Sequence, residues 1–380
     1  MALVLNEEQR LLRDTAREFL TKNAPVAELR RLRDNCDEIG YSPSLWQEMV
    51  ALGWAGIPVQ EAFGGLDFGY LGLGVVLEET GRTLTPSPLF ATLVLGASAI
   101  QLGGNESQKE RLLPAIVAGE LTLALALEEH NHHNPTGFST SLRKENGQYL
   151  LNGSKCFVLD GHSADQCLVV ARNDSGCTQS ADAVCLVLVP RETDGVQCDR
   201  TLMADSRNAA NLTFQNVVIE DGWIIGEGSE GQTLLEAVLD RGRVALCAEM
   251  LGLAREAFER TVDYLKERTQ FGVKIGSFQA LQHRAAIMLT ELELCQSVVL
   301  QALTAVDEDS DQLPAMASLA KAKMNELVQT VTNEAVQMHG GIGVTDELDI
   351  GLFLKRARVC MQVLGDSGYH KDRYARLCGY

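Results

Sequence analysis

The sequence is short of basic residues, and this shortage limits what the protein can bind. It has 33 lysines and arginines against 51 aspartates and glutamates, which gives a formal net charge of −18 at pH 7. Non-specific binding to nucleic acid needs a basic surface, so the charge argues against a nucleic-acid partner. An anionic small ligand stays compatible, because a few local arginines and helix N-termini can hold a nucleotide.

Long apolar runs and cysteine motifs are missing as well. No run of about eighteen apolar residues occurs, so we expect no membrane span. The first residues, MALVLNEEQRLLRDTAREF, place acids and arginines where a signal peptide needs an apolar stretch, which predicts a cytoplasmic protein. The 10 cysteines form no C-x-x-C pair and have no regular spacing, a pattern typical of buried, reduced thiols.

The residue patterns divide the chain into three segments. Residues 1–120 show helical periodicity, residues 121–228 hold short β-rich runs, and helical periodicity returns over 229–380. This order argues against an alternating parallel sheet. We predict an α+β fold with an N-terminal helical domain, a middle antiparallel β-domain and a C-terminal four-helix bundle.

Two local signals add detail, and one motif is absent. Asn6 is expected to cap the first helix because acids follow it. Asn152-Gly153 lies between two β-rich runs and predicts a hairpin turn. No G-x-G-x-x-G follows a predicted strand, so a dinucleotide would not be held in the Rossmann manner.

Three longer stretches carry a resemblance to a known family. They are LGWAGIPVQEAFGGLDFGYLGLGVVLEETGRTL, YLKERTQFGVKIGSFQALQHRAA and AVQMHGGIGVTDE, in this order. Over nearly its whole length the chain resembles the acyl-CoA dehydrogenases. The resemblance implies an FAD enzyme that desaturates an acyl-CoA thioester between its α and β carbons, with hydride passing to flavin N5. It also implies an electron-transfer flavoprotein or similar acceptor, and a tetramer that is homomeric or mixed with a large subunit.

The R-x-Q-F-G run has two interpretations. The resemblance implies that Arg268 faces the flavin pyrophosphate, to which a guanidinium can donate two hydrogen bonds. Gln270, Phe271 and Gln279 would then line the same cofactor. Alternatively the run is only a helix end, with Gly272 stopping the helix and Phe271 packing under it.

The glycine motif at Gly340-Gly341 also has two interpretations. The resemblance implies that Gly340 and Gly341 let the backbone approach the flavin dinucleotide of a neighbouring subunit, with Gln337 beside them. This arrangement would require an oligomer. The alternative is a flexible turn between helices.

Further flavin contacts implied by the resemblance include Leu127, Phe157 and Ser367. The middle domain departs from the family, which commonly has Thr-Glu-Pro where residues 127–130 are Leu-Glu-Glu-His. Phe157 stands in place of a tryptophan, and Leu159 replaces a hydroxyl near flavin N5. These changes put the redox behaviour of the flavin in doubt.

Asp240 and Arg243 lie one helical turn apart, where the family contacts CoA. The resemblance therefore implies substrate binding. In the alternative interpretation, the two side chains form an exposed ion pair that stabilises the helix by only a few tenths of a kcal/mol.

The position of the catalytic base is where the sequence departs most from its family. The family usually carries a glutamate in a Tyr-Glu-Gly-Thr segment, and the best match places Gly365 there. A second position used by some members is Gly242, so both are without a carboxylate. Asp366 is the nearest candidate base. In the alternative interpretation, Asp366 is an acid at a helix terminus and has no role in catalysis.

A narrower resemblance, in LDRGRVALCAEMLG, GSFQALQHRAA and LGDSGYH, is to small subunits of pimeloyl-CoA dehydrogenase-type enzymes. It raises a second hypothesis, a non-catalytic flavin-binding partner subunit, beside an enzyme that is active itself. A third option is a flavoprotein that carries out another reaction, such as an oxidase. The histidines of HNHH match no common zinc site, so we expect a solvated loop and no metal.

Overall fold

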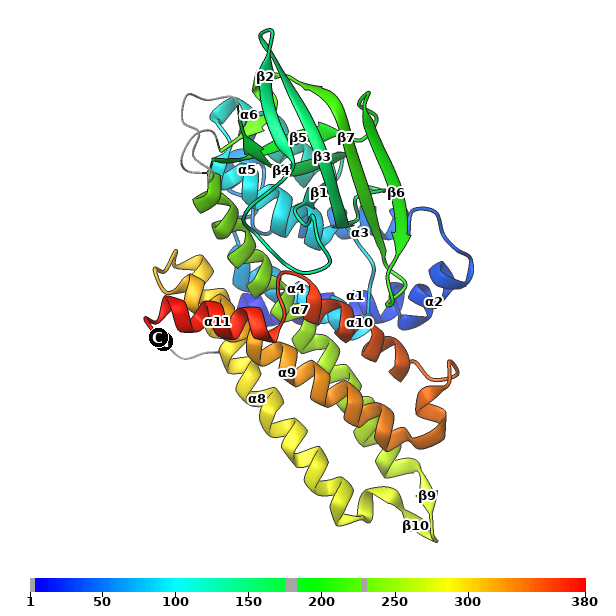
Figure 1. Cartoon of the computed structure of the whole chain (residues 1–380). Coiled ribbons are helices and arrows are strands. Elements are labelled where there is room, and N and C mark those ends of the chain that lie inside the picture. Colours follow the sequence, from blue (N-terminus) through cyan, green and yellow to red (C-terminus); the bar gives the residue numbers. More distant parts are fainter. Residues whose placement is uncertain (1–3, 175–182, 227–230) are drawn as a thin grey trace. The chain divides into compact units, whose positions relative to one another are not determined.

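The computed structural model describes residues 4–174, 183–226 and 231–380 (Figure 1). The chain forms two compact units. Unit 1 comprises the chain up to Arg31, Tyr70–Thr85 and Arg243–Tyr380, and unit 2 comprises Leu32–Gly69 and Pro86–Gly242. The three predicted domain boundaries stay a prediction, and the boundary at 228/229 lies outside the described residues.

Unit 2 joins helices to a β-sheet. Its helical elements are the end of α2 (Val26–Asp34), which begins in unit 1, and α3 (Pro43–Ala51), η1 (Trp54–Gly56), η2 (Glu61–Phe63), the π-helix η3 (Leu89–Ala97), α5 (Ser98–Gly103), α6 (Glu106–Val117) and η4 (Asp221–Trp223). Its strands are β1 (Leu123–Ala126), β2 (Ser141–Glu145), β3 (Gln148–Leu159), β4 (Gln166–Asn173), β5 (Val184–Pro190), β6 (Val196–Leu202), β7 (Asn208–Ile219) and β8 (Ile224–Ile225).

The sheet runs in the order β6-β7-β3-β2-β4-β5-β8, with β1 added beside β4. Most neighbours are antiparallel, as predicted, but β4 pairs in parallel with both β1 and β2. The central strands β4 and β5 are buried over nearly their whole length. Alternating apolar residues of these strands and of β7 form one core, which includes Val169, Val187 and Phe214.

The hairpin prediction at Asn152-Gly153 is wrong. Strand β3 continues through this pair, with an irregularity in its register against β7 at Leu151/Gly153. Gly153 has φ +145, and a Cβ there would lie 2.5 Å from the Thr140 hydroxyl, so glycine is required by close approach. The turn between β2 and β3 uses another Asn-Gly pair, Asn146-Gly147, whose φ values of 51° and 85° suit a tight hairpin.

Unit 1 is built from long helices. They are α1 (Glu7–Asn23), α4 (Gly69–Thr83), α7 (Gly231–Glu267), α8 (Gln279–Asp307), α9 (Leu313–His339), α10 (Ile350–Gln362) and α11 (Ser367–Leu377), of which α4 and α7 begin within unit 2. The strands β9 (Thr269–Gln270) and β10 (Val273–Lys274) and the turns η6 (Ile275–Ser277) and η7 (Gly340–Val344) connect them. Figure 1 shows the β9–β10 hairpin at the end of α7, where the chain turns back into α8.

Helices α4 and α7 cross in direct backbone contact. A Cβ on Gly81 would lie 2.0 Å from the carbonyl oxygen of Glu249, and one on Gly252 would lie 1.7 Å from the carbonyl oxygen of Glu78. Only glycine permits such an approach. The buried carboxylate of Glu249 then accepts two hydrogen bonds from Arg356, at 2.9 and 3.0 Å. The N-terminal helices of unit 1 and its C-terminal helices therefore share one interior.

Several smaller predictions can be checked. Asn6 caps α1 and forms a capping box with Gln9, which confirms the prediction. The nine described cysteines are free, and five of them are buried, whereas Cys36 and Cys378 are exposed. Cys177 lies outside the described residues. Among the described residues one helix, α8, is long and apolar enough by length and composition to cross a membrane, because an 18-residue window of it has a mean hydropathy of 1.4.

Candidate functional site

The residues of the R-x-Q-F-G run lie on the surface of unit 1. Helix α7 ends at Glu267, and Arg268, Gln270 and Gln279 are exposed around the β9–β10 hairpin. Phe271 is 92% exposed, so the alternative in which it packs under the helix end is wrong. Its ring packs edge-to-face with that of Phe278, with the ring centroids 6.2 Å apart. The guanidinium of Arg268 has no hydrogen-bond partner among the described residues.

The turn after α9 leaves its backbone accessible. Gly340 has φ +65, and no atom lies within 4 Å of a Cβ built on it or on Gly341. Beneath the turn, the ring of His339 stacks on Tyr264 at 4.4 Å and its Nδ1 lies 2.7 Å from the Ala335 carbonyl oxygen. Burial lowers the pKa of His339. The turn therefore rests on a packed base, which argues against the flexible alternative. Gln337, Gly340 and Gly341, together with Arg268, Gln270, Phe271 and Gln279, are called the dinucleotide end below.

In unit 2 the predicted contacts differ in exposure. Phe157 has φ +52 and is 52% exposed, because a register shift between β3 and β7 turns this residue outward. Leu159 is half-buried. Leu127 is buried, and its carbonyl oxygen accepts a hydrogen bond from Lys155 Nζ at 3.0 Å. Of these residues, Phe157 is the most exposed, and its contact with flavin stays a prediction.

A buried ion pair supports this part of the sheet. Lys155 Nζ donates to Glu129 Oε1 at 2.8 Å and lies 4.6 Å from the centre of the Phe138 ring. Burial opposes the charge of both partners. It lowers the pKa of Lys155 to about 8, whereas the charge of Lys155 and hydrogen bonds to Ser139 and Thr140 outweigh burial and lower the pKa of Glu129 to about 2. The pair holds the chain after β1 against β3.

The carboxylate of Glu128 is bound by residues of the HNHH loop. Its Oε1 lies 2.6 Å from Nδ1 of His133, and its Oε2 accepts from the Asn134 backbone at 3.2 Å. The His133 side chain is almost fully buried, so the prediction of a solvated loop is wrong for His133, although His130 and His132 are exposed. No group of three metal-ligating side chains occurs among the described residues.

The segment Val363–Ser367, where the resemblance places the family's catalytic base, is packed tightly against neighbouring side chains. Leu364 and Gly365 have φ +59 and +111. A Cβ on Gly365 would lie 2.6 Å from the Tyr369 ring and 2.8 Å from His370 Nε2. His370 is fully buried, and its Nε2 lies 2.9 Å from the Leu364 carbonyl oxygen. A glutamate in this position would therefore need both rings to move.

A buried lysine holds the same segment from below. Lys321 Nζ donates to the carbonyl oxygens of Cys360 and Gly365, at 2.9 and 3.1 Å, and to Asn325 Oδ1 at 2.9 Å. The three hydrogen bonds use all three protons of the ammonium group. Burial lowers the pKa of Lys321 to about 8. Lys321 and the segment Val363–Ser367 are called the closed segment below.

The two predicted CoA contacts are buried. Arg243 is fully buried, with Nη2 3.2 Å from the Tyr369 hydroxyl and Nε 3.4 Å from the Leu364 carbonyl oxygen. Asp240 is 2% exposed. The alternative of an exposed ion pair is therefore wrong, and Arg243 ties α7 to the closed segment.

Asp366 is the N-cap of α11. Its Oδ1 accepts from the Tyr369 backbone N–H at 2.8 Å, and Ser367 follows as the first residue of the helix. This geometry supports the alternative interpretation of Asp366 as a helix-terminal acid. A catalytic role for Asp366 stays a prediction.

Sequence reasoning missed Lys321 and the pair of Glu128 with His133. A signal for the lysine was available, because Lys321 occupies the apolar stripe of α9 with Ala317, Met324 and Val328, whereas Lys323 does not. The partner of Glu128 comes from a loop without periodicity, so the sequence offered no comparable signal for it.

Comparison with known proteins gives a consistent result. The sequence matches models for the acyl-CoA dehydrogenase N-terminal domain over residues 6–120, middle domain over 124–217 and C-terminal domain over 229–378. It is 30% identical to mitochondrial isovaleryl-CoA dehydrogenase of Pongo abelii, covering 93% of this chain and 85% of that one.

Two solved structures are similar over almost the full length. Butyryl-CoA dehydrogenase from Megasphaera elsdenii has a TM-score of 0.90 at 26% identity, covering all of both chains. A variant named Tcur3481-Tcur3483 steroid ACAD has a TM-score of 0.87 at 31% identity, covering 98% of each. These matches confirm the predicted fold, with its N-terminal helical, middle β and C-terminal helical parts.

The described residues fit FAD, the cofactor that these matches imply. Arg268 offers an unpartnered guanidinium for a pyrophosphate, Gly340 and Gly341 leave backbone open to a nucleotide, and Phe157 presents a ring on which an isoalloxazine would pack. Both the motifs and the geometry agree with the sequence comparison. The chain belongs to the acyl-CoA dehydrogenase family of FAD-dependent oxidoreductases.

Proposed function

We propose that this chain is a flavin-binding subunit of a mixed acyl-CoA dehydrogenase and that the catalytic carboxylate belongs to another chain. The observation that carries this proposal is the closed segment. Gly365 has no room for a side chain, and Asp366 is engaged as a helix cap. The family reaction requires a carboxylate within hydrogen-bond reach of the α-proton of the thioester.

FAD, when bound, supplies the hydride acceptor for the desaturation of an acyl-CoA. Arg268 would bind its pyrophosphate, with Gln270, Phe271 and Gln279 around it. Gln337 and the Gly340-Gly341 backbone would approach the dinucleotide of a neighbouring subunit. An electron-transfer flavoprotein or a similar acceptor would then reoxidise the flavin.

The oligomer we propose is a tetramer built as a pair of dimers. Large apolar side chains stay exposed along the first half of α8, including Ile287 at 60% and Leu294 at 56%. An apolar face of this kind is typical of a surface covered by another chain. The double variant Ile287→Asp/Leu294→Asp should dissociate the assembly in sedimentation, whereas Leu202→Asp, at an exposed position of unit 2, should not. A stable wild-type monomer that retains flavin would exclude this arrangement.

Two measurements test the function itself. The purified chain should retain FAD, and Arg268→Ala should weaken flavin binding at least tenfold, because a charged hydrogen bond contributes about 1.5–3 kcal/mol. Arg10→Ala removes an exposed arginine of α1 and should leave flavin binding unchanged. Equal retention by both variants would count against the cofactor assignment.

The second measurement is anaerobic bleaching of the bound flavin by acyl-CoA. We expect little or no bleaching by this chain alone and strong bleaching once a glutamate-bearing partner chain is added. If the chain alone bleaches fully and Asp366→Asn abolishes this activity, then Asp366 is the base and the chain is a complete enzyme. Full bleaching that Asp366→Asn leaves unchanged would mean that the base lies in another segment of this chain.

A further inference from the structure

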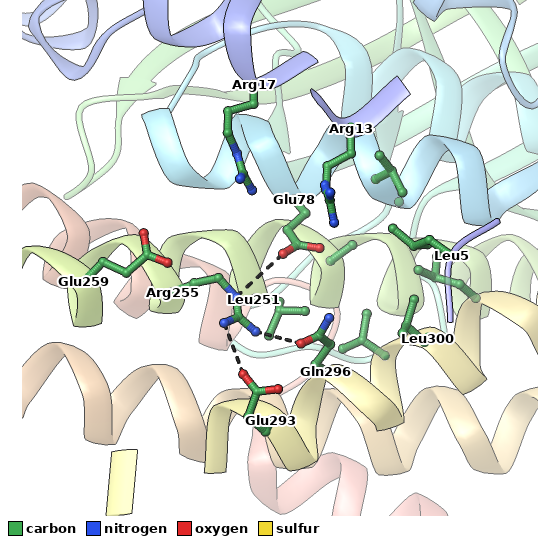
Figure 2. A pocket seen from close by; sticks show the side chains of 15 residues that line it. Leu5, Arg13, Arg17, Glu78, Leu251, Arg255, Glu259, Glu293, Gln296 and Leu300 are labelled. Atoms are coloured by element: carbon green, nitrogen blue, oxygen red, sulfur yellow. Dashed lines mark hydrogen bonds and ion pairs between the residues drawn. The ribbon is translucent and has the colours of Figure 1, made fainter. Parts of the chain in front are cut away.

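Unit 1 contains a cavity that none of the residues assigned to FAD or acyl-CoA lines. It has a volume of about 400 Å³, and its walls come from α1, α4, α7 and α8 together with Leu5 (Figure 2). A cavity of this size can hold a small organic molecule. One part of its wall is apolar and is formed by Leu5, Val75, Leu251, Val299, Leu300 and Leu303.

The other part of the wall is charged, and Glu78 lies at its centre. The close crossing of α4 over α7 at Gly252 fixes the backbone of Glu78. Figure 2 shows its carboxyl group between Arg13 and Arg17 on one side and Arg255 on the other. The position of this carboxyl group is therefore set by two packed helices.

Each of the three arginines is hydrogen-bonded to an acid other than Glu78. Arg17 donates two hydrogen bonds to Glu79, at 3.0 and 2.7 Å, and Arg13 donates to Asp14 at 2.9 Å. Neither acid lines the cavity. Both arginines thus bring little uncompensated positive charge to the site.

The third arginine is held on the opposite wall. Arg255 donates to Glu293 at 3.2 Å and to Gln296 at 2.8 Å, whereas its Nε stays 3.9 Å from Glu78. Glu259, the remaining acid in the wall, accepts from Arg82. Glu78 accepts no hydrogen bond from the side chains described here, and its ion pair with Arg255, at 3.9 Å, is longer than those of Glu259 and Glu293.

A carboxylate in this position needs either a proton or a cation. Burial, followed by the charge of Glu79, raises the pKa of Glu78 against the opposing effect of Arg255. An anion would meet Glu78, Glu259 and Glu293 together, with each arginine already bound. The combination of one unmet acceptor with an apolar wall selects a cation that carries a hydrocarbon body.

We propose that this cavity binds a primary or secondary alkylammonium ion. Its N–H groups donate to the carboxylate of Glu78, and its carbon chain packs against Val75, Leu251 and Leu300. This site is separate from the proposed acyl-CoA chemistry, so either proposal can fail without the other.

Three probes that share one carbon chain test the proposal: n-hexylammonium, 1-hexanol and hexanoate. Titration calorimetry on the full chain should show hexylammonium binding at least tenfold more tightly than hexanol, and hexanoate binding most weakly. Glu78→Gln should weaken hexylammonium binding at least tenfold, because a charged hydrogen bond is lost, and should leave hexanol binding within about threefold. Glu110→Gln, which removes the same charge from the exposed face of α6, should change neither.

A second variant keeps the test independent of the folding of Glu78→Gln. Leu300→Phe fills the apolar part of the cavity and should abolish the binding of both hexylammonium and hexanol. Circular dichroism melts establish that each variant is folded. Absence of hexylammonium binding to the wild type, equal or tighter binding of hexanoate, or unchanged hexylammonium binding to either folded variant would overturn the proposal.

Discussion

The dinucleotide end and the closed segment, both in unit 1, use their polar groups in opposite ways. At the dinucleotide end Arg268 and Gln337 are exposed, and Phe271 is almost entirely so. Lys321 of the closed segment, and Arg243 and His370 packed against it, are fully buried and bind backbone carbonyls of the same chain. Among the described residues, the Arg268 guanidinium makes no hydrogen bond, whereas the buried cationic and imidazole groups around Gly365 all contact backbone carbonyl oxygens.

In the function proposed above, this difference separates cofactor binding from catalysis within one chain. Exposed, unpartnered side chains cost little in the free protein and gain hydrogen bonds when a ligand or a second chain arrives. Buried polar groups must be satisfied within the fold, and a segment satisfied in this way stabilises the protein without offering a reactive group. A chain can therefore keep the family's flavin surface and lose its base.

The largest effect that would test this contrast is expected from Gly365→Glu. The new side chain would combine a backbone at φ +111 with contacts of 2.6 and 2.8 Å to Tyr369 and His370. Strain and overpacking together should lower the free energy of unfolding by about 3–5 kcal/mol. We expect no gain in desaturase activity.

The matched control is Gly341→Glu at the dinucleotide end, where a Cβ meets open space. Its effect on stability should be less than about 1 kcal/mol. Urea denaturation of both variants measures the contrast. A stable Gly365→Glu protein that gained activity would show that the segment can open to accept the glutamate.

The sequence identifies residues of the exposed surface through short motifs, whereas the buried segment depends on contacts that no motif contains. Arg268 and Gly340 belong to such motifs and are exposed, and their part in flavin binding stays a prediction. The role of Gly365 depends on Tyr369 and His370 packing back against it, and that of Lys321 on a carbonyl more than forty residues away. Contacts of this kind depend on the tertiary fold, which local pattern does not contain.

The same limit explains the error in the β-domain. Two Asn-Gly pairs lie six residues apart, and turn propensity alone does not distinguish them. Pairing of β3 with β7 along its length keeps Asn152-Gly153 inside a strand and leaves Asn146-Gly147 as the turn. Segment order and element type were predictable, whereas register was not.

Lys321→Met should give the next largest effect. The substitution keeps most of the side-chain volume but removes the ammonium donor from the carbonyl oxygens of Cys360 and Gly365 and from Asn325 Oδ1. The loss of these buried hydrogen bonds should lower the free energy of unfolding by about 2–4 kcal/mol. Lys323→Met, on the exposed side of α9, should change it by less than about 1 kcal/mol.

The pH dependence of this difference sharpens the test. The pKa of Lys321 is about 8 in the folded protein against 10.5 for an ordinary lysine. Because the unfolded chain binds the extra proton between these values, stability from this group rises as pH increases from about 8 to 10.5. The wild type should therefore gain stability relative to Lys321→Met over that range. A difference that stays constant would mean that Lys321 titrates normally.

The smallest effects are expected at Asp366, and they separate a cap from a base. Asp366→Ala removes the acceptor for the Tyr369 N–H and should cost about 1 kcal/mol, the usual value for a lost N-cap. Asp366→Asn keeps an oxygen acceptor, so its stability should stay within a few tenths of a kcal/mol of the wild type. The asparagine cannot accept a proton as a base, whereas it caps a helix nearly as well as aspartate. If flavin bleaching by the assembled complex is unchanged in Asp366→Asn, the carboxylate acts only as the N-cap of α11. If bleaching is lost while the melting temperature and flavin content stay the same, Asp366 acts on the substrate and the segment is not closed to chemistry.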